Sequence, residues 1–166
     1  MVLRLGPSAT SAALAEADRG EFSHIAVVVT GGRGAAVVHT TTGEPGHPDA
    51  AQVESLQSYL RPDAASAALA IRADRLTEPQ RQKVVQAALA FATRKVPFDY
   101  AFDLRTADKL YCTELVWRVF LSAGYDLIGS PEPMAFPLLG TRPYIPLHLF
   151  SRNPALTRIA SYASQS

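Results

Sequence analysis

Cys112 is the only cysteine in the 166-residue chain, and it lies in the segment KLYCTELVWRVF, residues 109–120. The apolar spacing after it is typical of a helix that begins near the cysteine. A thiol attacks as its thiolate, and the positive end of a helix dipole and a neighbouring histidine both lower the thiol pKa. Lone buried cysteines more often serve as small apolar side chains. Which of the two applies to Cys112 depends on whether the fold brings a histidine to it.

Two of the four histidines are placed to reach such a thiol together. His24 opens the run HIAVVVT (24–30), and His39 lies near the end of AAVVHTT (35–41), with the turn GGRG between them. This pattern predicts a β-hairpin, in which His24 lies near residue 41 and within diagonal reach of His39. One imidazole would take the thiol proton while the second orients the first. We interpret His47 as a loop surface residue and His148 as a packing or solvent-facing residue.

A sheet and at least one further helix are needed to position these residues. Strands are predicted at 2–5 and 67–73 beside the hairpin, with a last edge strand at 156–162. Helices are predicted at 8–18, at 50–60, from Thr77 to about Lys95 with a Thr77–Gln80 capping box, and after Tyr111. The last of these buries Leu115, Val116, Val119 and Phe120 and ends near Gly124. The proline-rich segment 130–150 is expected to be mostly irregular.

The composition is that of a single globular domain spanning residues 1–166, with 48% hydrophobic and 19% charged residues. A net charge of +1 without basic tracts argues against nucleic acid as a partner, and no apolar run is long enough for stable membrane insertion. One cysteine excludes an internal disulfide, and two histidines alone are a weak metal signal, so no metal is expected. Charges at Glu16, Asp18 and Arg19 argue against an export signal, which predicts a cytoplasmic location and leaves export of a longer precursor open. Oligomeric state is not predicted.

The segments FSHIAVVV, AAVVHTT, PFDYAFDL and KLYCTELVWRVF together resemble the circularly permuted papain-like cysteine hydrolases of the NlpC type, the YiiX-like group. The resemblance implies an α+β fold, a small antiparallel sheet or partial barrel packed against the cysteine helix. It also implies that Cys112 is the nucleophile and His24 the general base. The third position, often a glutamate in this group, is His39 here, which is similar to the lecithin-retinol acyltransferase branch. Tyr100 matches an aromatic residue near the site.

The resemblance implies thiolate attack on a carbonyl and needs no cofactor. The leading hypothesis is a cysteine peptidase or amidase that cleaves an amide or ester through a thioacyl-enzyme, on peptide-like cell-wall fragments. Tyr100 and Tyr111 are the candidate substrate-binding residues. One alternative is an acyltransferase or thioesterase-like enzyme on lipid substrates, with the segment 131–140 lining an acyl groove. The other is an inactive binding module, because the usual glutamate is missing from its expected place.

Overall fold

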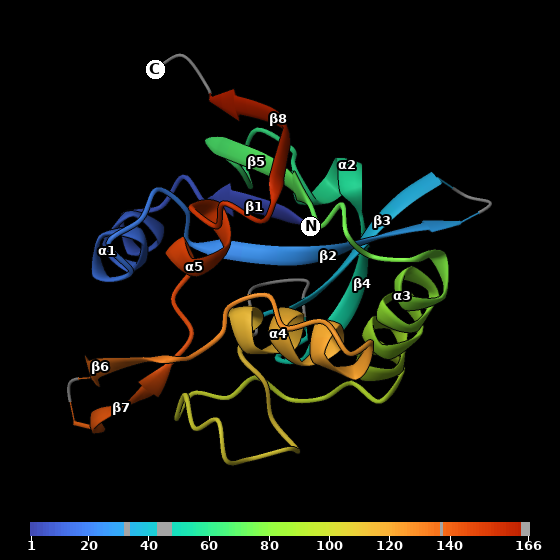
Figure 1. The fold of residues 1–166 in the computed structure, drawn as a ribbon. Helices are drawn as coiled ribbons and strands as arrows, with labels where there is room; N and C mark the ends of the chain where they lie inside the picture. Colours follow the sequence, from blue (N-terminus) through green and yellow to red (C-terminus); the bar gives the residue numbers. More distant parts are fainter. Residues whose placement is uncertain (32–33, 43–47, 137, 164–166) are drawn as a thin grey trace.

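The computed structural model describes residues 1–31, 34–42, 48–136 and 138–163. His47 and the centre of the predicted GGRG turn lie outside these residues. The main sheet has six antiparallel strands in the order β4-β3-β2-β1-β5-β8. Their bounds are β1 (Val2–Leu5), β2 (His24–Gly31), β3 (Gly34–Thr40), β4 (Ala51–Ser55), β5 (Ala67–Arg72) and β8 (Thr157–Ala163). Figure 1 shows how strongly the strand direction turns between β8 and β4.

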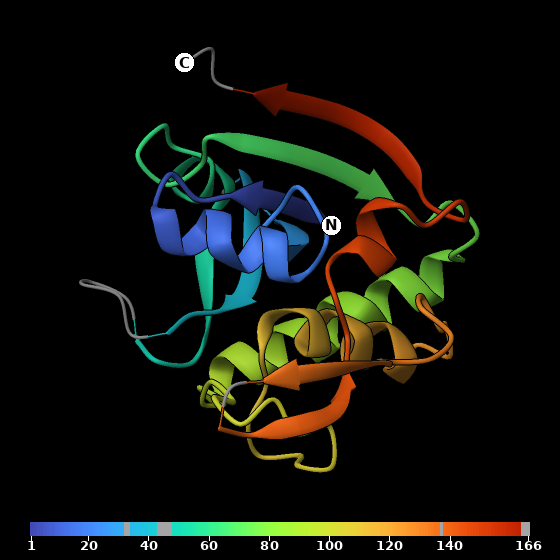
Figure 2. The same ribbon diagram turned by 90° about the vertical axis from the view of Figure 1, so that its left-hand side faces the viewer.

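Helices cover the sheet. A separate two-stranded hairpin, β6 (Glu132–Phe136) and β7 (Gly140–Tyr144), lies beyond them. The helices are α1 (Ala9–Ala17), α2 (Leu56–Tyr59), α3 (Glu78–Thr93), α4 (Cys112–Ser122) and α5 (His148–Ser151). In Figures 1 and 2, α3 and α4 run side by side beneath the sheet, and contacts join α4 to β2 and β3. The fold is therefore α+β, with the cysteine helix packed on the antiparallel sheet as predicted.

Helix α4 is held to the sheet by its apolar stripe. Leu115, Val116, Val119 and Phe120 are all buried, as the spacing predicts. They share one core with side chains of β2 and β3, and each large apolar side chain so buried contributes about 1.5–3 kcal/mol. The helix ends where Gly124 adopts φ +73, a conformation that glycine reaches without a Cβ penalty. Packing and termination thus fix where the first residue of the helix lies.

The segment 50–60 is not the predicted helix. It forms strand β4 followed by the single turn α2, for which Ser55 is the N-cap. Residues of β4 alternate in burial and pair with the open edge of β3, including His39 with Gln52. Backbone pairing at that edge outweighs a helical preference that is weak in so short a segment. This correction matters for the site, because it places Glu54 on a strand next to His39.

The segment 130–150 is more ordered than the proline count predicts. It contains the hairpin β6–β7 and the short helix α5. Pro133 and Pro143 are directly opposite each other in the hairpin. A two-stranded ribbon has only edge strands, so a residue without an N–H is tolerated there. The predicted strands at 2–5, 67–73 and 156–162, and the capping box at Thr77 and Gln80, are confirmed.

Candidate active site

Cys112 is the first residue of α4, and its neighbours hold the helix start in place. Tyr111 is the N-cap, with extended backbone at φ −94 and ψ 170. The hydroxyl of Thr113 donates a hydrogen bond of 2.6 Å to the Ile145 carbonyl, which ties the first turn to the chain after β7. Cys112 itself is half-buried. The thiol thus lies where the sequence predicts, at the unsatisfied N–H end of a helix.

The charge state of the thiol differs from the sequence-based expectation. Burial raises the pKa of Cys112 to about 12, and the charge of Asp18 acts in the same direction. Backbone N–H groups of Ile25, Thr113 and Cys112 itself lower this pKa, but they do not outweigh burial. The resting side chain is therefore a neutral thiol at pH 7. Its contact with the Ile25 N–H brings the sulfur to the β2 backbone next to His24 in the chain.

His24 and His39 meet as the hairpin pairing predicts. The strand register continues from Val27 opposite Val38, and Nε2 of His24 lies 2.9 Å from Nδ1 of His39. The ring of Tyr59 packs against both imidazoles, with centroid separations of 5.9 and 5.2 Å. Burial lowers the pKa of His24 well below its usual value, and the nearby charges of His39 and Arg4 add to this effect. His24 is therefore a neutral imidazole at rest.

Glu54 extends the histidine pair into a chain of three. Its Oε2 lies 3.1 Å from Nε2 of His39, and the two side chains are 10% and 0% exposed. In the register of β3 and β4, Glu54 is opposite Val37 and hence diagonal to His39. Sequence reasoning missed Glu54 because it assigned residues 50–60 to a helix. The sequence Ala51–Ser55, AQVES, has only a short apolar and polar alternation, and the strand forms because β3 offers it an edge.

The glutamate next to the thiol has a structural part in the helix start. Burial raises the pKa of Glu114 to about 7, although its contacts with Arg118 and with the Tyr111 N–H lower it. Arg118 bonds to Glu114 at 2.7 Å and also donates to the carbonyls of Leu104 and Thr106. Glu114 at the third helical position that bonds back to the N-cap N–H is half of a capping box. The pair clamps the loop before Cys112 onto the helix.

A cavity of about 680 Å³ contains both Cys112 and His24 in its lining. Tyr100 and Tyr111 line it too. Tyr100 is 55% exposed, and its hydroxyl donates to Oδ1 of Asp49 at 3.1 Å. Tyr111 is buried, and its hydroxyl accepts the Ile145 N–H at 3.1 Å. Tyr100 therefore lies at the rim of the cavity, whereas Tyr111 belongs to its wall.

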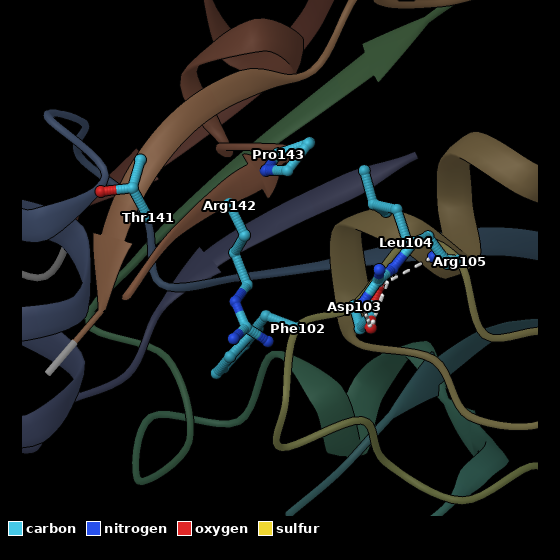
Figure 3. Close-up of a pocket in the computed structure, with 7 residues that line it drawn as sticks. All are labelled: Phe102, Asp103, Leu104, Arg105, Thr141, Arg142 and Pro143. Carbon is cyan, nitrogen blue, oxygen red and sulfur yellow. Dashed lines mark hydrogen bonds and ion pairs between the residues drawn. The ribbon is translucent and has the colours of Figure 1, made fainter. Parts of the chain in front are cut away.

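Figure 3 shows a second, smaller cavity of about 290 Å³, formed by residues 102–105 and 141–143. Asp103 and Arg105, two residues apart on one side of it, pair at 2.7 Å, and its lining holds neither a cysteine nor a histidine. Among the described residues of segment 131–140, none lines the larger cavity. The described residues of that segment therefore give no support to the acyl groove expected from it.

Asp18 is a buried group near the thiol that sequence reasoning did not single out. It accepts the Leu147 N–H at 2.8 Å and the Tyr144 hydroxyl, and burial raises its pKa. His148 neither packs alone nor faces solvent: its Nδ1 bonds to the Asp18 carbonyl at 2.8 Å and its Nε2 to Glu132 at 3.1 Å. No local sequence pattern marks Asp18, because its partners come from segments near the other end of the chain.

Within the described ranges, no group of three or more His, Cys, Asp or Glu side chains is arranged to hold a metal ion. A helix long and apolar enough to cross a bilayer is likewise not found in that part of the chain.

An antiparallel sheet with a cysteine-bearing helix packed on it, and histidines that precede the cysteine in the chain, define a permuted papain-like fold. The chain belongs to the permuted papain-like amidase family YaeF/YiiX, C92, whose sequence pattern matches residues 6–131. A crystal structure described as that of the metalloprotein YiiX from Escherichia coli O157:H7 has a similar fold. It superposes with a TM-score of 0.77 at 19% sequence identity and covers 98% of this chain and 95% of that one. The comparison with curated proteins found no match.

Proposed function

We propose that the protein is a cysteine amidase that cleaves an amide or ester bond through a thioester formed on Cys112. The observation that carries this proposal is one cavity lined by both Cys112 and His24, with Nε2 of His24 2.9 Å from His39. Family membership supports amidase chemistry. Peptide-like cell-wall fragments are the substrates that we propose.

Glu54 and His39 set the tautomer of the base in this proposal. A carboxylate only accepts hydrogen bonds, so Glu54 selects the His39 tautomer with its proton on Nε2. Nδ1 of His39 is then a bare acceptor for the Nε2 proton of His24. Nδ1 of His24 is thereby left unprotonated and able to take the thiol proton. Glu54 thus supplies the carboxylate that this group often has at the third position. It acts on His24 through His39 instead of directly.

The reaction follows from these protonation states. As the Cys112 sulfur bonds to the substrate carbonyl carbon, its proton moves to His24. The C–N bond then breaks and His24 returns the proton to the leaving amine, which leaves a thioester. Water attacks the thioester, His24 takes one of its protons, and the acid is released as the thiol is restored. The backbone N–H of Cys112, without an intrahelical partner, is a donor for the oxyanion.

Two observations favour this proposal over the alternatives. The segment 131–140, which motivated a lipid acyltransferase, does not line the cavity in its described part. The inactive binding module was motivated by a missing glutamate, whereas Glu54 contacts His39. Tyr100 at the rim would contact the bound substrate, and Tyr111 would form the wall behind its scissile bond.

The test is to find and quench the acyl-enzyme. The protein is mixed separately with N-acyl peptides, aryl amides and long-chain esters. Each reaction is quenched in acid, the protein is digested, and the mass of the peptide containing Cys112 is measured by mass spectrometry. We expect a thioester there, and we expect Cys112→Ala to lower kcat/KM by at least about 10³-fold. Ser122→Ala, at the other end of α4, is the matched control. Undiminished turnover by the Cys112→Ala protein would refute the proposal, and acylation by long-chain esters alone would favour the lipid alternative.

A further inference from the structure

Four charged side chains line the cavity, and three of them have partners. Asp18 accepts the Leu147 N–H, and Nε of Arg61 pairs with Asp63 at 2.9 Å. The fourth is Arg4, for which no carboxylate lies within ion-pair distance in the described part of the chain. A cation that is partly withdrawn from water without a counter-ion loses hydration, and neutral partners compensate for that loss only in part. Arg4 is therefore the charged residue of the cavity wall that a bound anion would neutralise.

The guanidinium of Arg4 is held in a fixed position beside the base. Its Nη1 donates to the Tyr59 carbonyl at 2.8 Å, and its Cζ lies 4.3 Å from the Tyr59 ring centroid. Arg4 is the direct cross-strand partner of His24, so the two side chains share one face of the sheet. Arginine has five N–H donors, and this anchoring bond uses one of them. The others are available to an anion in the cavity.

The charge of Arg4 acts against the proposed chemistry unless a substrate neutralises it. It disfavours protonation of His24 and so contributes to lowering the pKa of that imidazole. The bond to the Tyr59 carbonyl and the cation–π contact with the Tyr59 ring hold the guanidinium in place, but neither supplies a negative charge that offsets it. An anionic group bound at Arg4 would remove the unfavourable field just when His24 takes up the thiol proton.

We propose that Arg4 binds a negatively charged group of the substrate, a carboxylate or a phosphate, close to the scissile carbonyl. This inference rests on the proposed function and names its substrate class: acyl donors that carry an anionic group next to the bond to be cleaved. Arg4 is then a specificity-determining residue, and neutral acyl donors are poorer substrates.

Alkylation of the single thiol tests the inference without a known substrate. Iodoacetate and iodoacetamide are close in size and differ in charge. In each reaction the sulfur bonds to the CH₂ carbon of the reagent and iodide leaves. We measure the ratio of their second-order rate constants at Cys112, normalised to the unfolded protein. Effects of a substitution on thiol ionisation apply to both reagents and cancel in the ratio.

In Arg4→Gln we expect the iodoacetate-to-iodoacetamide ratio to fall by about tenfold, the lower range for a hydrogen bond to a charged group. Arg4→Lys keeps the charge and should retain most of the ratio. Arg61→Gln, on the same wall but already paired, should leave it unchanged. An unchanged ratio in Arg4→Gln, or an equal fall in Arg61→Gln, overturns the inference.

Competition distinguishes the two anions. Acetate or inorganic phosphate is added during labelling by iodoacetamide, and the one that protects Cys112 in an Arg4-dependent way identifies the bound group. Protection by neither overturns the inference. Failure of this inference is separable from failure of the proposed function. Turnover that depends on Cys112 can occur without an Arg4-dependent iodoacetate-to-iodoacetamide ratio, and that ratio can be measured without any turnover.

Discussion

Replacing Glu54 with alanine removes the carboxylate whose Oε2 lies 3.1 Å from Nε2 of His39. His39 can then adopt the other tautomer and donate from Nδ1 to Nε2 of His24. In that arrangement the proton of His24 is on Nδ1, the nitrogen that should receive the thiol proton. The base is blocked, although no atom that touches the substrate has changed.

The size of the effect follows from the bond that is lost. A close contact of a buried imidazole with a carboxylate contributes at most about 1.5–3 kcal/mol, the range for a hydrogen bond to a charged group. His39 and Glu54 are 0% and 10% exposed, so solvent screening is weak. At about 1.4 kcal/mol per factor of ten, kcat/KM should fall by roughly 10–150-fold. Glu54→Gln keeps an acceptor but no charge, and a smaller loss is expected.

The assay is the pH dependence of kcat/KM for each variant. Glu54 stabilises the protonated state of the histidine pair, so its removal should move the acid limb to lower pH while it lowers the plateau. Val53→Ala is the matched control, since Val53 is the adjacent residue on β4 and is 51% exposed. A folded Glu54→Ala protein whose kcat/KM stays within about twofold of the parent at every pH would show that the tautomer reasoning is wrong.

Three further outcomes are expected. The lowered pKa of His24 should keep the protein active below pH 6.5, with kcat/KM lost only as pH falls through that lowered value; an acid limb above 6.5 would contradict the burial of the base. Burial raises the pKa of Glu114 from 4.5 to about 7. Its contribution to the free energy of folding is therefore full below pH 4.5 and is lost as pH rises through 7, about 3 kcal/mol in all. Denaturant titrations at pH 5 and 8 should show most of this loss in the parent protein and less of it in Glu114→Gln. Gly124→Ala should lower the free energy of unfolding by about 1–2 kcal/mol, because alanine is strained at φ +73. A Cβ at this position would meet no atom within 4 Å, so no clash adds to this cost. An unchanged free energy of unfolding would mean that the helix end relaxes to another backbone conformation.

Much of the fold follows from local patterns that the sequence displays. The alternation and β-branched runs of β1, β2, β3 and β5 and the capping box of α3 are satisfied by contacts close in the chain. The buried stripe of α4 is equally local, since Leu115 and Val119 repeat at helical spacing. The meeting of His24 and His39 was also predictable, because a hairpin pairs residues symmetrically about its turn.

The sequence by itself therefore determined β1, β2, β3, β5, α3 and α4 and the pairing of the two histidines, since these depend on short-range geometry. Only the tertiary structure decided that Glu54 reaches His39, because a short segment became a strand once β3 offered it an edge. It also decided the protonation state of Cys112, because burial, which local sequence does not reveal, outweighs the helix start that would favour the thiolate. The unpaired charge of Arg4 on the cavity wall is of the same kind, since only folding sets which charges lack a partner.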